Sequence, residues 1–230
     1  GLSSLFTSVL QILSLSELGI GSAIVFSMYK PVAEGNTDEI NALLKLYRKF
    51  YYIIGIVILI IGIALVPFIP KLISGEYPQD INLYALYLIY LSNTVISYFL
   101  FAYKTSVLNA FQRSDIESNL TTVINIGMYI LQIITLIVFR NYYLYIIWLP
   151  IATIFINVLR SYIVDKQYPE ICCAGEVSSE VKHDIFKRVG ALIGHQLSGT
   201  VNCSLDNIVV SAFLGLKVVA QYGNYYYIVS

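Results

Sequence analysis

Long apolar runs alternate with short charged connectors along this sequence, and that alternation most constrains its fold. Charged residues make up only 12% of the 230 residues, against roughly a quarter in soluble domains. The mean hydropathy is +0.73. A helix of about 20 apolar residues crosses the hydrocarbon core of a bilayer. The sequence therefore predicts an all-α, polytopic transmembrane helical bundle, and it excludes a soluble enzyme domain.

Six complete spans and the start of a seventh are predicted from these runs. The first is expected to end at Lys30-Pro31, because proline breaks a continuing helix. Both ends of the sequence fall in apolar segments, so we expect the chain to be an internal piece of a longer protein. The spans cover about residues 2–29, 50–70, 81–103, 120–139, 142–164 and 190–214, and the seventh begins near residue 221.

Two connectors carry helix-start signals. Asn36 followed by Glu39 has the spacing of a helix cap, and the amphipathic stretch after it predicts a helix lying on the membrane surface. From about residue 165 the longest polar stretch forms a linker. Within it, Ser178 to Glu180 is predicted to start a short surface helix that ends at Lys187-Arg188.

Basic residues are distributed unequally between alternate connectors. Eleven of the 14 Lys and Arg residues fall on one side of the predicted spans, and only Lys71, Arg140 and Lys217 fall on the other. Because Lys and Arg are retained on the cytoplasmic side during insertion, the first span is predicted to run from outside to inside.

Polar residues follow one face of the first predicted span. This face carries, in chain order, Thr7, Gln11, Ser14, Glu17 and Gly21. Successive members are four, three, three and four residues apart, which places them on one side of a helix. An ionisable group at membrane depth usually faces a partner or a polar cavity. Glu17 is therefore a candidate for ion coupling or for lining a substrate cavity. The alternative for the whole stripe is ordinary helix packing, with Glu17 paired to a neighbouring helix.

A second polar stripe follows the sixth predicted span. His195, Gly199, Asn202 and Asp206 are spaced by four, three and four residues. Two such stripes on distant helices predict a water-accessible cavity between two helical bundles. The alternatives are a helix contact at His195 and a carboxylate near the outer interface at Asp206.

Catalytic, metal and cofactor motifs are lacking in this sequence. His195 and Ser198 stand three residues apart on one helix, which does not bring a nucleophile and its base together. The two histidines have no companion metal ligands, and no glycine-rich phosphate loop is present. The net charge is zero, so nothing indicates nucleic acid. We therefore expect a non-enzymatic protein without metal or cofactor.

Three segments resemble a known family. Glu17 to Ala23 (ELGIGSA), continuing to Tyr29-Lys30-Pro31, resembles the second-helix region of polysaccharide biosynthesis flippases, the Wzx-type family of the multidrug/oligosaccharidyl-lipid/polysaccharide exporter superfamily. Residues 108–113 (LNAFQR) and 206–215 (DNIVVSAFLG) agree with the same family, the latter with its seventh helix.

The resemblance implies a fold, a function and a location. The fold is a two-bundle, inverted V-shaped transporter with an internal repeat. Residues 1–189 would be the rest of the N-terminal bundle, and residues 190–230 the start of the C-terminal one. Such proteins flip undecaprenyl-diphosphate-linked oligosaccharide across the bacterial cytoplasmic membrane by alternating access, for O-antigen, capsule or exopolysaccharide synthesis, with a proton or sodium ion as possible coupling ion.

One departure from the family and two alternatives remain. The cavities of the family are often cationic, whereas the predicted spans are expected to hold no buried Arg or Lys. A multidrug or toxin efflux antiporter of the same superfamily is the first alternative. A membrane polysaccharide polymerase is the second, although it would require a large outer loop bearing Arg or His.

Overall fold

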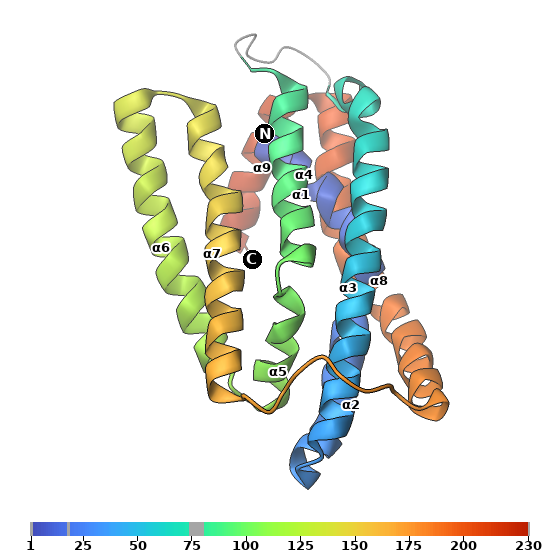
Figure 1. Ribbon diagram of the computed structural model, residues 1–230. Coiled ribbons are helices and arrows are strands. Elements are labelled where there is room, and N and C mark those ends of the chain that lie inside the picture. Colours follow the sequence, from blue (N-terminus) through green and yellow to red (C-terminus); the bar gives the residue numbers. More distant parts are fainter. Residues whose placement is uncertain (1, 18, 74–80, 230) are drawn as a thin grey trace.

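The computed structural model describes residues 2–17, 19–73 and 81–229, except for the side chains of residues 15, 16, 191, 193–204 and 226–229. Within this part of the chain all regular structure is helical, and the helices form a bundle (Figure 1). The α-helices are α1 (Leu2–Leu13), α2 (Ile20–Glu34), α3 (Thr37–Leu65), α4 (Leu83–Phe99), α5 (Thr105–Ala110), α6 (Ser114–Phe139), α7 (Tyr142–Gln167), α8 (Ser179–Leu214) and α9 (Leu216–Val229). Short 3-10 segments, η1 (Ser14–Glu17), η2 (Val66–Leu72) and η3 (Ala102–Lys104), lie between them.

Three described helices are long and apolar enough to cross a membrane. They are α3 together with η2, then α6, then α7. A fourth span results if α4 and α5, which meet at a bend of 53°, are counted as one. The described helices thus support three or four of the six predicted spans, and the protein is a membrane protein.

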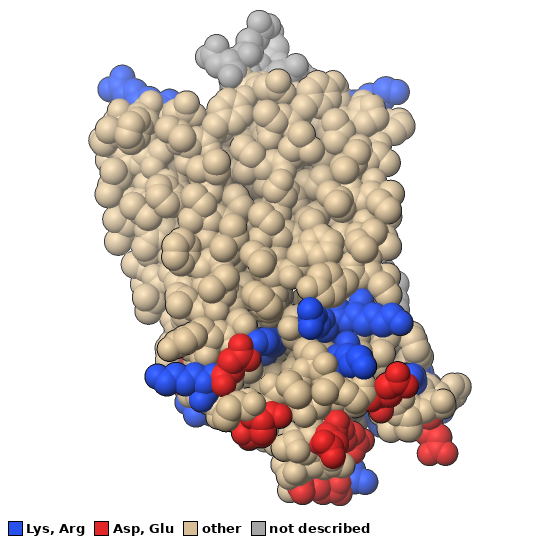
Figure 2. All heavy atoms as spheres, in the orientation of Figure 1, with Lys and Arg blue, Asp and Glu red and all other residues tan. Residues whose placement is uncertain are grey.

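The surface of the bundle is divided into an apolar belt and a charged end. Figure 2 shows most of the Lys, Arg, Asp and Glu side chains gathered at one end, an almost uncharged belt above it, and further basic side chains at the opposite end. The belt includes exposed isoleucines such as Ile60 on α3 and Ile137 on α6. The α2–α3, α5–α6 and α7–α8 connectors lie at the charged end, and the α6–α7 turn lies at the other (Figure 1). These connectors therefore alternate between the two ends of the bundle (Figure 1), as the distribution of Lys and Arg along the sequence predicts.

The first predicted span is interrupted rather than continuous. Helix α1 ends at Leu13, and Gly19 adopts φ +88° before α2 begins, a left-handed conformation that glycine tolerates readily. The predicted break at Pro31 is wrong, because Pro31 lies inside α2. Proline removes one backbone hydrogen bond here, and the helix continues to Gly35, whose φ of +68° ends it.

Both predicted caps are confirmed, but the separate surface helices are not. The Asn36 side chain accepts from the Glu39 N–H at 3.2 Å, and that of Ser178 accepts from the Val181 N–H at 3.3 Å. Each cap starts a long helix, α3 of 29 residues and α8 of 36. No proline interrupts residues 37–65 or 179–214. Each helix therefore continues without a break from its first turns at the charged end into the bundle.

Candidate functional site

A polar cavity of about 1010 Å³ lies among the helices from α2 to α7. Hydroxyl and amide side chains form most of its polar lining, and two charged groups, Glu117 and Arg160, complete it. Its described polar, charged and aromatic lining residues are Ser22, Phe26, Tyr29, Tyr47, Tyr51, Ser97, Thr105, Ser106, Asn109, Gln112, Ser114, Glu117, Thr121, Thr153, Asn157 and Arg160. The apolar bundle therefore contains an open chamber whose lining can hydrogen-bond a polar ligand.

An ion pair between α6 and α7 supplies the charges of this cavity. Arg160 Nη2 lies 3.1 Å from Glu117 Oε1, and Arg160 Nη1 donates to Asn157 Oδ1 at 2.7 Å. Arg160 is only 7% exposed and Asn157 only 3%. The expectation that the spans hold no buried Arg or Lys is therefore wrong. Thr153, Asn157 and Arg160, spaced four and three residues apart, form a polar face on α7 that could have revealed the cavity.

The cluster of Arg160, Asn157 and Glu117 retains two hydrogen-bond donors that have no acceptor. Neither Arg160 Nε nor Asn157 Nδ2 has a hydrogen-bond partner, although both are buried. Buried donors without acceptors are costly and uncommon in native proteins. Arg160 and Asn157 themselves line the cavity, so its wall offers a guanidinium and an amide to a ligand rich in acceptor oxygens, such as phosphates or sugar hydroxyls.

Glu17 is held beside the cavity by tyrosines from two other helices. Its two carboxylate oxygens accept from Tyr51 of α3 and Tyr98 of α4, each at 2.5 Å. Tyr47 donates in turn to the Tyr51 hydroxyl at 3.0 Å, and both of these tyrosines line the cavity. Gly21 permits this approach, because a Cβ there would lie 2.6 Å from the Tyr47 hydroxyl oxygen. Glu17 is thus linked to the cavity wall through hydrogen bonds.

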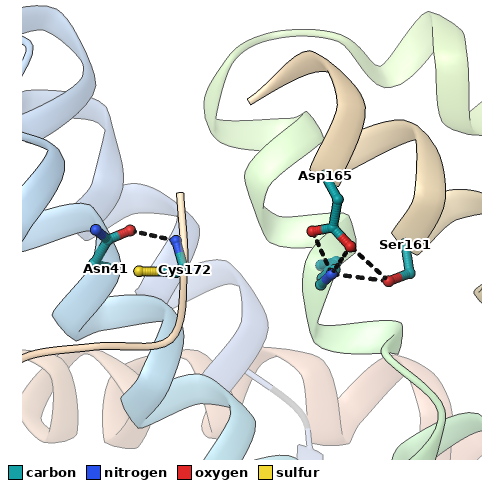
Figure 3. A network of polar contacts seen from close by, with 5 residues as sticks. Asn41, Ser161, Asp165 and Cys172 are labelled. Carbon is teal, nitrogen blue, oxygen red and sulfur yellow. Dashed lines mark hydrogen bonds and ion pairs between the residues drawn. The ribbon is translucent and has the colours of Figure 1, made fainter. Parts of the chain in front are cut away.

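The break between α4 and α5 also borders the cavity. Ser97 before the break and Asn109 after it both line the chamber, and Phe101 within it has φ +54°. Non-helical backbone at membrane depth is tolerated where it borders protein or a polar cavity. Lys104 fixes this break against α7 by donating to both oxygens of Asp165 at 2.6 Å and to Ser161 Oγ at 2.8 Å (Figure 3).

The other residues of the first predicted stripe do not meet at the cavity. Gln11 lies on α1, whereas Glu17 lies in η1 and Gly21 on α2, so these residues do not share one continuous helix. Gln11 is exposed. The Ser14 hydroxyl donates to the Leu10 carbonyl of α1 at 3.0 Å and also interacts with the Tyr98 hydroxyl. Among the described lining residues, neither Gln11 nor Ser14 is present.

The second predicted stripe is described only in part. Asp206 is exposed and accepts from the Tyr222 hydroxyl at 2.8 Å. The side chains of His195 and Asn202 lie outside the described residues. Helix α8 packs beside α1, where Asn207 Nδ2 donates to Ser8 Oγ at 2.9 Å. The described cavity lies among α2 to α7. A cavity between the two stripes stays a prediction, because most side chains of the second stripe lie outside the described residues.

The fold and the cavity together define a helical membrane protein with an internal polar chamber. Comparison of the chain with protein-family models, with curated proteins and with solved structures gives no match. The function is therefore argued from the chemistry of the cavity and from the sequence segments described above.

Proposed function

We propose that this chain belongs to a transporter that flips undecaprenyl-diphosphate-linked oligosaccharide across the bacterial cytoplasmic membrane by alternating access. The observation that carries the proposal is Arg160, an arginine in the lining of a cavity whose other polar groups are mostly hydroxyls and amides. Phosphate and sugar hydroxyl oxygens accept hydrogen bonds from such groups. Arginine is also the side chain best suited to phosphate geometry.

The size and lining of the cavity support the same ligand class. Its volume of about 1010 Å³ lies at the upper end of the range of ordinary small-molecule sites, which gives room for several sugar rings. Aromatic side chains such as Phe26 and Tyr29 lie on α2, and amides such as Asn109 lie on α5. Apolar ring faces beside amide and hydroxyl groups suit a carbohydrate, which has both apolar faces and hydroxyl edges.

Glu17 is the strongest candidate for coupling to a proton or sodium ion. It is the one residue of the first predicted stripe whose side chain reaches the cavity wall, through Tyr51. Asp206 and Gln11 lie elsewhere in the described structure, and Ser14 lies beside Tyr98 without lining the cavity, so we assign the three no role in it.

A multidrug or toxin antiporter fits the described lining less well. An organic cation requires an unpaired carboxylate or a strongly negative chamber. Glu117 is the acidic residue among the described lining residues, and it is already paired with Arg160. A polysaccharide polymerase is less favoured, because the α6–α7 turn, at the end opposite the charged one (Figure 1), consists of only Arg140 and Asn141 and is no large loop.

Blocking the cavity tests this proposal. The complete protein is reconstituted in vesicles, and the movement of fluorescent undecaprenyl-diphosphate-linked oligosaccharide between leaflets is measured. Thr121→Trp places an indole in the chamber and is expected to remove at least about nine-tenths of the flipping rate. Ile126→Trp, on the lipid-exposed face of the same helix, is the matched control and is expected to preserve it. Equal rates in the two variants would contradict the proposal, and so would movement of an organic cation in place of the lipid.

A further inference from the structure

The linker between α7 and α8 is docked along the first turns of α3. Residues 168–178 connect the two helices at the charged end of the bundle. Asn41 accepts from the Cys172 N–H at 2.7 Å (Figure 3) and donates to the Glu170 carbonyl at 3.3 Å. One turn further along α3, Lys45 donates to the Gly175 carbonyl at 2.9 Å. Asn41 and Lys45 therefore hold backbone groups over six residues of the linker.

Apolar contacts reinforce this docking. Ile171, between the two residues that Asn41 contacts, is 6% exposed, and Val177, beyond the Lys45 contact, is 8% exposed. At the α7 end, the Tyr168 ring lies 4.3 Å from that of Phe111, centroid to centroid. The linker therefore has one path across α3 and the α5–α6 turn.

The docking shortens the tether that connects α8 to the rest of the bundle. An extended chain spans at most about 3.5 Å per residue, so the twelve Cα-to-Cα steps from Gln167 to Ser179 could reach about 40 Å. With Gly175 fixed to α3, only residues 176–178 remain before α8, and the four steps from Gly175 to Ser179 reach about 14 Å. The first turn of α8 is then restricted to the neighbourhood of α3.

We infer that the α7–α8 linker is a strap that limits how far the charged end of α8 can separate from α3, with Asn41 and Lys45 as its clamps. The restraint follows from the docked backbone alone. Its use in transport rests on the proposed function, in which α8 would move relative to the helices around the cavity, and the strap would set the maximal opening at the charged end.

Two measurements on the reconstituted protein test the strap. Spin labels at Ile53 on α3 and Lys187 on α8, both exposed, are introduced after the native cysteines are replaced by serine. Asn41→Ala/Lys45→Ala is compared with Lys49→Ala, an exposed lysine one turn beyond Lys45. Hydrogen exchange reports whether residues 170–175 are released, and electron–electron double resonance reports the distance between the labels.

The double variant is expected to exchange at least about tenfold faster at the backbone amide of residue 172, which is serine in this background. It should also show an added population of label distances at least about 10 Å longer, because the released linker can reach about 40 Å from Gln167. The Lys49→Ala protein should match the parent in both measurements. Unchanged hydrogen exchange would overturn the claim that Asn41 and Lys45 hold the linker. Faster exchange with an unchanged distance distribution would overturn the claim that the docked linker restrains α8. Neither measurement involves a substrate, so failure of the flippase proposal would leave both results standing.

Discussion

Replacing Arg160 by methionine is expected to lower the free energy of unfolding by about 3 kcal/mol, the lower end of the cost of removing one partner from a buried ion pair. The lower end applies because the Glu117 side chain is 26% exposed, whereas that of Arg160 is only 9% exposed. The substitution leaves Glu117 without its cation and Asn157 without a donor to its Oδ1. Thermal unfolding of the purified protein in detergent measures the loss.

Two further variants separate this effect from a general loss of charge. Arg160→Met/Glu117→Met removes both charges and is expected to recover most of the stability, because no isolated charge remains. Arg113→Met breaks the exposed pair with Asp115, whose side chain is 57% exposed, and should cost less than about 1 kcal/mol. Equal losses for Arg160→Met and Arg113→Met would show that the cavity pair is as solvated as a surface pair.

Glu17→Leu is expected to destabilise the protein by about 3 kcal/mol, since hydrogen bonds to a charged group contribute roughly 1.5–3 kcal/mol each. The substitution leaves the hydroxyls of Tyr51 and Tyr98 without their acceptor at the junction of α2, α3 and α4. The same unfolding measurement applies, with Glu17→Gln as the conservative comparison that retains an acceptor oxygen.

The tyrosines provide the decisive control for Glu17. If the cost arises from unpaired hydroxyls, removing them in the Glu17→Leu/Tyr51→Phe/Tyr98→Phe variant should restore much of the lost stability. A triple variant no more stable than Glu17→Leu would mean that Glu17 acts through contacts other than these two hydrogen bonds.

Local sequence signals predicted part of the fold. Uninterrupted apolar runs identified α3, α6 and α7, because a span of about 20 residues needs no tertiary information to be recognised. The caps at Asn36 and Ser178 were found for the same reason, since each satisfies backbone groups within three residues of itself. These features depend on neighbours in the sequence.

The cavity depends on contacts between distant residues, and most of it was missed. A stripe of polar residues defines one face only if the helix is continuous, whereas α1 ends at Leu13 and the left-handed turn at Gly19 separates Glu17 from Gly21. Glu17 meets Tyr51 and Tyr98 across 34 and 81 residues, separations that helical spacing does not reveal. Arg160 was assigned to a connector because it lies near the end of its span, although its polar face on α7 was visible in the sequence.

Accessibility of single cysteines to a membrane-impermeant thiol reagent tests the central claim, that a polar chamber lies inside the apolar bundle. In a background where the native cysteines are serine, Asn109→Cys and Thr121→Cys place thiols on the cavity wall. Ile130→Cys places one on the exposed apolar face of α6. We expect the two cavity thiols to react in membranes and the Ile130→Cys thiol to remain unlabelled. Protection of both cavity thiols, with or without labelling of Ile130→Cys, would contradict the account.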